Sequence, residues 1–120
     1  MPPLTPPEPE PEFASRPDNR TILTGRLLEL SALRYTPAGV PVLGFRIAHS
    51  SQQSEADVER AVGCEISAVA LGPNAQLMAG AKPGEAVRLT GFLAAKSLKS
   101  RSLILHVNEI EFLEGNQNGI

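Results

Sequence analysis

Alternating hydrophobic and polar residues predict that this chain folds mainly into β-strands. Leu43, Phe45 and Ile47 alternate with small or polar residues, which is the period of a strand with one buried face. Similar patterns predict strands over residues 20–31, 42–49, 61–71, 85–95 and 102–113. Between the third and fourth of these strands, Pro73 near the start and Gly80 at the end predict one short helix.

Glycine, proline and polar residues mark the connections between the predicted strands. Gly25 lies inside the first strand pattern and predicts a bulge or a sharp bend there. Residues 34–41 contain two prolines and a glycine and predict a turn, whereas the polar residues 50–60 predict a long loop. In the last strand the apolar pattern slips by one residue between Val107 and Ile110.

The order of the predicted elements is typical of one fold. Three strands, a helix and two further strands form an all-β, five-stranded OB-fold barrel with one short helix between strands three and four. Closing the barrel pairs the edge strands that a small open sheet would expose. An open sandwich built from the same strands is the structural alternative.

The first strand also predicts an oligomeric state. Its apolar residues lie on both faces, and they are Ile22, Leu28 and Leu30 on one face with Leu23 and Leu27 on the other. A barrel strand needs only one apolar face for its own core, so the second face predicts a homodimer.

Composition divides the 120 residues into a tail and one domain. Seven of the 11 prolines lie in residues 1–18, together with four acidic side chains and one basic one, a formal charge of −3. Such a segment buries too little apolar surface to offset the entropy lost on ordering, so we expect a disordered tail. We expect the barrel domain over residues 19–115 and a short flexible end over residues 116–120.

The sequence argues against an enzyme. His49 and His106 have no carboxylate at a familiar catalytic spacing, and no phosphate-binding glycine loop or metal-binding motif occurs. We therefore expect no catalytic residue, no metal and no cofactor. The single cysteine, Cys64, excludes an internal disulfide, and its place in an apolar strand predicts a small buried thiol. The first residues lack the features of a signal peptide, and no apolar run approaches the roughly 20 residues of a membrane span, so we expect a cytoplasmic protein.

Several motifs resemble a known family. Residues 19–51 read NRTILTGRLLELSALRYTPAGVPVLGFRIAHSS, residues 91–97 read GFLAAKS, and residues 105–111 read LHVNEIE. These stretches resemble the bacterial single-stranded-DNA-binding protein superfamily and, within it, the family of primosomal replication protein N (PriB). The resemblance covers residues 19–114. The length favours the primosomal family, because the replicative proteins follow their barrel with a long Gly/Gln/Pro-rich linker.

The resemblance implies a function. Members of the family are OB-fold homodimers that bind single-stranded DNA and act with the PriA helicase and other primosome proteins to restart stalled replication forks. The alternatives are a replicative-type single-stranded DNA-binding protein and an OB-fold protein adaptor with weak DNA binding. Relatives often stack bases on tryptophan, and this chain has none, so we expect weaker and more salt-sensitive binding.

The candidate DNA-binding residues are mostly cations near the loops that flank the binding face of an OB fold. The strongest cluster is Lys96, Lys99 and Arg101, which lie within six residues in the loop between the last two strands. The alternative interpretation of this cluster is a solubilising hairpin tip. The remaining candidates are Arg34 and Tyr35 in the first proline-rich turn, Arg46 on the polar face of the second strand, and Arg88 on that of the fourth.

The aromatic residues divide between core and surface. Phe45 and Phe112 are predicted to lie in the core, and Tyr35 has the alternative of packing over the loop prolines. Phe92 shares the polar face of the fourth strand, with a dimer or core contact as its alternative. His106 is a further candidate to face the nucleic acid, together with Asn108.

Overall fold

The computed structural model describes residues 17–113. The predicted tail, residues 1–18, lies outside this range except for Pro17 and Asp18. The predicted flexible end, residues 116–120, lies outside it entirely.

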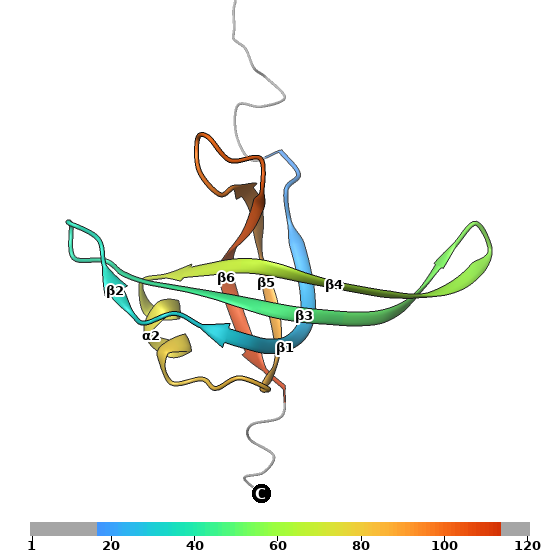
Figure 1. The fold of residues 1–120 in the computed structure, drawn as a ribbon, viewed down its shortest axis with the longest axis horizontal. Helices are drawn as coiled ribbons and strands as arrows, with labels where there is room; N and C mark the ends of the chain where they lie inside the picture. The colour runs from blue at the N-terminus through green and yellow to red at the C-terminus, as the bar shows by residue number, and fades with distance from the viewer. Residues whose placement is uncertain (1–16, 114–120) are drawn as a thin grey trace, which may run out of the picture.

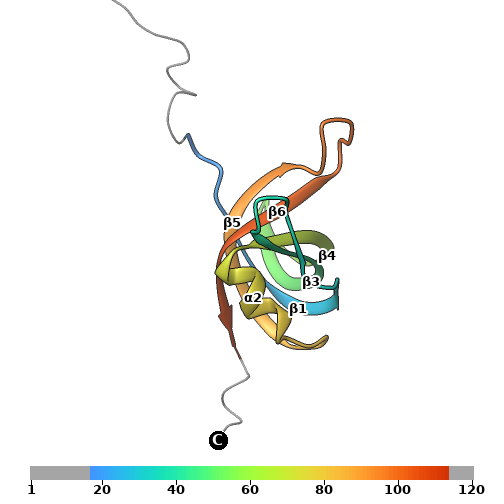
Figure 2. The same cartoon turned by 90° about the vertical axis from the view of Figure 1, so that its left-hand side faces the viewer.

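Five strands close into a barrel, and a sixth, very short strand extends its edge (Figures 1 and 2). The elements are β1 (Thr21–Leu30), β2 (Arg34–Tyr35), β3 (Pro41–Glu55), β4 (Val58–Leu71), α2 (Pro73–Ala79), β5 (Ala86–Ala95) and β6 (Leu103–Phe112). Hydrogen bonding follows the order β1-β5-β6-β4-β3-β2, and an additional pairing of β1 with β3 closes the ring. The β4–β6 pair is parallel and the others are antiparallel. The predicted OB-fold barrel is therefore confirmed, and the open sandwich is excluded.

The first strand, β1, pairs with two different strands, and a glycine permits the bend between its two halves. Residues 21–26 pair with β5, whereas residues 26–30 pair with β3. A Cβ atom on Gly25 would collide with the backbone oxygen of Ala48, so only glycine fits at this bend. The register then shifts between Leu27 and Glu29. Both the bend and the bulge agree with the irregularity predicted at this glycine.

A second glycine permits the phase slip in the last strand. Thr90 lies opposite Glu109 and Gly91 lies opposite Val107, so Asn108 is the extra residue of a bulge. A Cβ atom on Gly91 would overlap the carbonyl group of His106. The predicted one-residue slip is confirmed, and it requires a position that only glycine can occupy.

Alternate residues of the barrel strands form the core, as the sequence predicts. The largest fully buried side chains are Leu27, Leu43, Ile47, Met78, Leu89, Leu105 and Val87. Phe45 is buried among them, and Phe112 is partly buried against the same cluster. The helix α2 adds Ala75 and Met78 to this core.

The prediction of a long loop over residues 50–60 is wrong. β3 and β4 stay paired from Val42 with Leu71 to Glu55 with Val58, and they form an arm that extends well beyond the barrel (Figure 1). Ala56 and Asp57 make the turn with positive φ angles of 52° and 66°. A two-residue turn of this hand suits a twisted hairpin, but it usually contains glycine or asparagine, and here it does not. The predicted turn over residues 34–41 also contains a short paired segment, β2, whose two residues face Val42 and Pro41.

The prediction of a buried thiol is wrong as well. Cys64 is exposed, because its part of β4 lies on the arm, where no second layer covers the sheet. Its register partner His49 is held by the carbonyl oxygen of Thr24 at 2.7 Å and by the hydroxyl of Ser51 at 2.8 Å. Within residues 17–113 no cluster of three metal-ligating side chains occurs, and no helix there is long and apolar enough to cross a membrane.

Candidate nucleic-acid interface

A hollow of about 500 Å³ lies on the outer face of the barrel and brings together three of the predicted cations. Arg34 comes from β2, Arg46 from β3, and Lys96 from the start of the β5–β6 loop. These elements are far apart in the sequence, but the pairing of β2 with β3 and the closure of the ring place them around one depression. The arrangement therefore concentrates positive charge from three separate segments.

The floor of this hollow is made by outward-facing residues of neighbouring strands. On β3, Gly44 and Arg46 lie opposite Val69 and Ser67 of β4, while the intervening residues point into the core. Ile104 of β6 also lines the hollow. The floor is thus small, partly apolar and open to solvent, which suits contact with an extended polymer.

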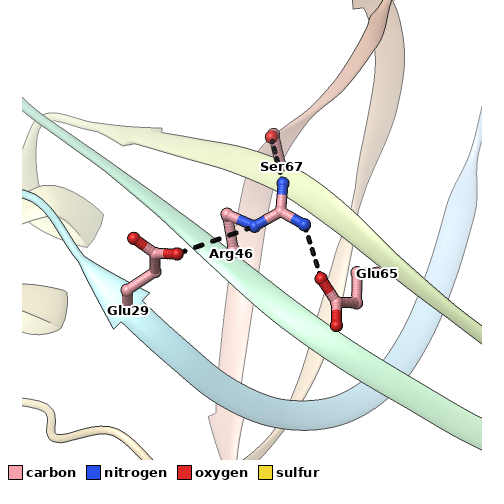
Figure 3. A network of polar contacts seen from close by, with 4 residues as sticks. All are labelled: Glu29, Arg46, Glu65 and Ser67. Carbon is pink, nitrogen blue, oxygen red and sulfur yellow. Dashed lines mark hydrogen bonds and ion pairs between the residues drawn. The ribbon is translucent and has the colours of Figure 1, made fainter.

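Arg46 is held in place by groups on both neighbouring strands (Figure 3). Its guanidinium donates a hydrogen bond to Glu65 at 2.7 Å and another to Ser67 at 3.3 Å, and its Nε lies 3.9 Å from a carboxylate oxygen of Glu29. A guanidinium has five N–H donors, and these two hydrogen bonds use two of them. Arg46 is therefore oriented, but the two carboxylates offset much of its charge.

The β5–β6 loop presents the other predicted cations without such compensation. The loop is closed by a hydrogen bond from the Lys96 amide to the Ser102 carbonyl at 2.8 Å, and serine hydroxyls accept from two further amides. Lys96, Lys99 and Arg101 are exposed, and among residues 17–113 no carboxylate forms an ion pair with any of them. Of the three, Lys96 lines the hollow, and Lys99 and Arg101 follow it in the same short loop.

The remaining two sequence candidates lie in different surroundings. Tyr35 follows Arg34 in β2 and is 58% exposed, but it does not line the hollow, because consecutive strand residues point to opposite faces. Arg88 forms an ion pair with Glu111 on the outer face of β5 and β6. It does not line the hollow, and it lies eight residues before Lys96, at most about 26 Å of extended chain. The fold does not bring Arg88 together with the other cations.

The structure also reveals groups that the sequence analysis did not combine. Phe92 and His106 are cross-strand neighbours on the outer faces of β5 and β6, and their rings stack with centroids 5.1 Å apart and planes 1° apart. The sequence did not predict a role for Glu29, Glu65 or Ser67. Only the strand register shows that these three surround Arg46, so the signal needed was the pairing of β3 with β1 and β4.

Comparison with known proteins assigns the chain to a family. Residues 19–109 match the family described as "Another single-strand binding protein family". The chain is 36% identical over 107 residues to the replication restart protein PriB of Nitrosomonas europaea, a match that covers 89% of this chain and 98% of that protein. It is 39% identical over 98 residues to the PriB of Bordetella pertussis, covering 82% and 92% respectively. The chain belongs to the PriB family of replication restart proteins.

Solved structures agree with this assignment. The PriB of Ralstonia solanacearum superimposes with a TM-score of 0.72 at 34% identity, covering 80% of this chain and 99% of that one. The single-stranded DNA-binding protein of Thermus aquaticus superimposes with a TM-score of 0.66 at 24% identity, covering 82% of this chain and 52% of that one, and it supports the fold alone. The relatives named here are replication restart and single-stranded DNA-binding proteins, and none carries the name of an enzyme.

Proposed function

We propose that this protein binds single-stranded DNA across the outer hollow and the β5–β6 loop, as an accessory protein of the replication-restart primosome. The observation that carries the proposal is the convergence of Arg34, Arg46 and Lys96 around one open depression. The loop that supplies Lys96 also carries Lys99 and Arg101, which no carboxylate of the described residues neutralises.

The geometry favours a single strand over a small anion. The cations come from β2, β3 and a loop, so they are spread out as the phosphates of a DNA strand are. A site for a single phosphate would instead gather its cations in one closed pocket. The floor between them carries small and apolar side chains such as Gly44 and Ile104, which leave room for a sugar or a base. Tyr35 is an exposed aromatic residue beside Arg34 in β2 and stays a candidate for stacking outside the hollow.

Removing the loop cations tests the proposal. Lys96, Lys99 and Arg101 are replaced together by alanine, and binding to labelled oligo-dT is followed by fluorescence anisotropy at several salt concentrations. Each phosphate contact to a single strand contributes about −0.7 to the slope of log K against log salt, so the variant's slope is expected to flatten by about 2. A fourfold increase in salt weakens binding by both proteins, and the factor by which it weakens the variant is then about 18 times smaller than the factor for the unchanged protein.

The fold offers a matched control for this experiment. Arg60→Ala removes a cation that is likewise paired with a carboxylate, Glu55, near the turn between β3 and β4, and that lies outside the hollow. We expect its affinity and slope to stay unchanged. A triple variant that is folded by circular dichroism and still binds with the original affinity and slope contradicts the interface.

The partners of this protein belong to the same proposal. We propose that it stimulates the PriA helicase at stalled forks in the bacterial cytoplasm. A helicase assay with forked DNA checks this, and unwinding that is equal with and without the protein contradicts it. Stimulation without any affinity for oligo-dT would instead favour the adaptor function.

The proposal includes a homodimer. Ile22 and Leu28 of β1 are exposed on the outside of the barrel, and a second copy is the partner that would cover them. Light scattering should give twice the mass of one chain at micromolar concentration. A mass of one chain contradicts the dimer.

A further inference from the structure

A second hollow, of about 700 Å³, lies on the outer surface of β5 and β6. Phe92 of β5 forms part of its wall. Arg20 and Asn19 contribute from the segment before β1, and Asn108 and Glu109 contribute from the bulge in β6. The interface proposed above makes no use of this hollow.

Phe92 presents an unusual surface to the hollow. Its ring is stacked in parallel on His106, yet the residue remains 39% exposed. An aromatic ring has two faces, and His106 covers only one of them. The outer strands thus hold a stack of two rings that a third flat ring could extend.

The walls of the hollow are held by the backbone. The Asn19 side chain both donates to the Leu93 carbonyl at 2.9 Å and accepts from the Leu93 amide at 3.0 Å, in the manner of an additional strand residue. This contact fixes the segment that carries Arg20 against β5. On the other side, the bulge at Asn108 is fixed by the register of β5 with β6. The hollow is therefore preformed.

The charges around the hollow indicate what it can hold. Asp18 and Glu109 are acidic and Arg20 is basic, so the charged side chains of the lining sum to −1. The net negative charge would repel a phosphate, whereas it would not repel a neutral flat group. Thr90 and Asn108 place hydrogen-bonding side chains around Phe92, which suits the polar edge of a heterocycle.

We propose that this hollow binds a nucleobase of the single strand, stacked on Phe92 and continuing the Phe92–His106 pair. The inference rests on the proposed function and adds a base-binding site to its phosphate contacts. Phe92 on β5 lies four residues before Lys96, at most about 13 Å of extended chain, so one strand of DNA can reach both. Stacking on an aromatic ring tolerates every base, so the site adds affinity without selecting a sequence.

A cycle of protein and DNA changes tests the stacking contact. Phe92→Ala and Phe92→Leu are each titrated with oligo-dT and with an oligomer of abasic residues of equal length. Loss of one stacked base is expected to weaken oligo-dT binding by about 5- to 150-fold. The abasic oligomer should bind the variants and the unchanged protein equally. The salt slope should also stay unchanged, because stacking releases no counterions.

A tryptophan probe places the base directly. The chain contains no tryptophan, so Phe92→Trp introduces a single fluorophore at the proposed stack. Its emission is expected to be quenched on adding oligo-dT and to stay unchanged with the abasic oligomer. Leu77→Trp is the control, since Leu77 is 49% exposed on α2 and lines neither hollow. Its emission should not respond to either DNA.

The outcomes separate the inference from the function on which it rests. Two results would overturn the base site while leaving the phosphate interface standing. One is equal weakening of oligo-dT and abasic binding by the Phe92→Ala and Phe92→Leu changes, and the other is an emission response of Phe92→Trp that matches that of Leu77→Trp. An unchanged protein that fails to bind oligo-dT overturns the proposed function, and the base site with it.

Discussion

The ion pair between Arg46 and Glu65 predicts a variant that binds DNA more tightly. Glu65→Gln removes one negative charge beside the hollow, while the amide oxygen can still accept the hydrogen bond from Arg46 that now spans 2.7 Å. The pair is solvent-exposed, so its loss should change the stability of the fold by no more than about 1 kcal/mol. The change should therefore act mainly on bound phosphate.

The expected gain follows from simple electrostatics. A phosphate bound by the Arg46 guanidinium would lie roughly 5 Å from the Glu65 carboxylate, where two unit charges in water repel by about 0.8 kcal/mol. Screening at 0.1 M salt reduces this to about 0.5 kcal/mol. Removing the repulsion should raise the affinity about 2- to 4-fold. If Arg46 then engages a phosphate fully, the salt slope steepens by up to about 0.7.

A titration with oligo-dT at two salt concentrations measures both quantities, and the structure supplies a matched control. Glu55 is also an exposed carboxylate paired with an arginine, at 69% exposure against 57% for Glu65, but its partner is Arg60, near the turn between β3 and β4 and outside both hollows. Glu55→Gln makes the same change in net charge and should leave binding unchanged. Equal gains in both variants would mean that net charge alone is responsible, and weaker binding by Glu65→Gln would refute the reasoning.

Two further predictions concern the fold and the tail. Gly91→Ala forces a Cβ atom against the His106 carbonyl and should lower the free energy of unfolding by about 1–3 kcal/mol in urea denaturation. Gly80→Ala, whose Cβ would meet only the Leu77 carbonyl oxygen at 3.9 Å, should differ little, and equal losses in both would contradict the steric argument. Removing residues 1–16, which carry three acidic side chains and one basic one, should tighten oligo-dT binding at about 0.01 M ionic strength and much less at 0.15 M. Unchanged affinity at the lower salt would exclude competition between this segment and DNA.

The barrel strands were predictable because one face of each strand is buried, so apolar and polar residues alternate along the sequence. Leu43, Phe45 and Ile47 all lie in the core, and the slip between Val107 and Ile110 marks a real bulge. The arm was not predictable in this way. Where β3 and β4 leave the core, neither face is buried, so residues such as Gln52 and Gln53 carry no periodic signal.

The candidate site was predictable only in part. A run of nearby cations such as Lys96 to Arg101 is visible in one stretch of sequence. The grouping of Arg34 with Arg46, the carboxylates beside Arg46, and the separation of Arg88 all depend on which strands are neighbours. Local sequence therefore identified residue types, while the strand register decided which of them share a surface.

The parallel pairing of β4 with β6 has a consequence for biosynthesis. In this pairing Ala68 and Val69 lie opposite Leu105 and His106, and the two segments are separated by 37 residues. His106 is also one of the two stacked rings beside the second hollow. A nascent chain that still lacks β6 therefore has neither a closed barrel nor the stacked pair of Phe92 and His106. The base-binding site proposed above is therefore complete only after the last strand has been synthesised and has joined the barrel.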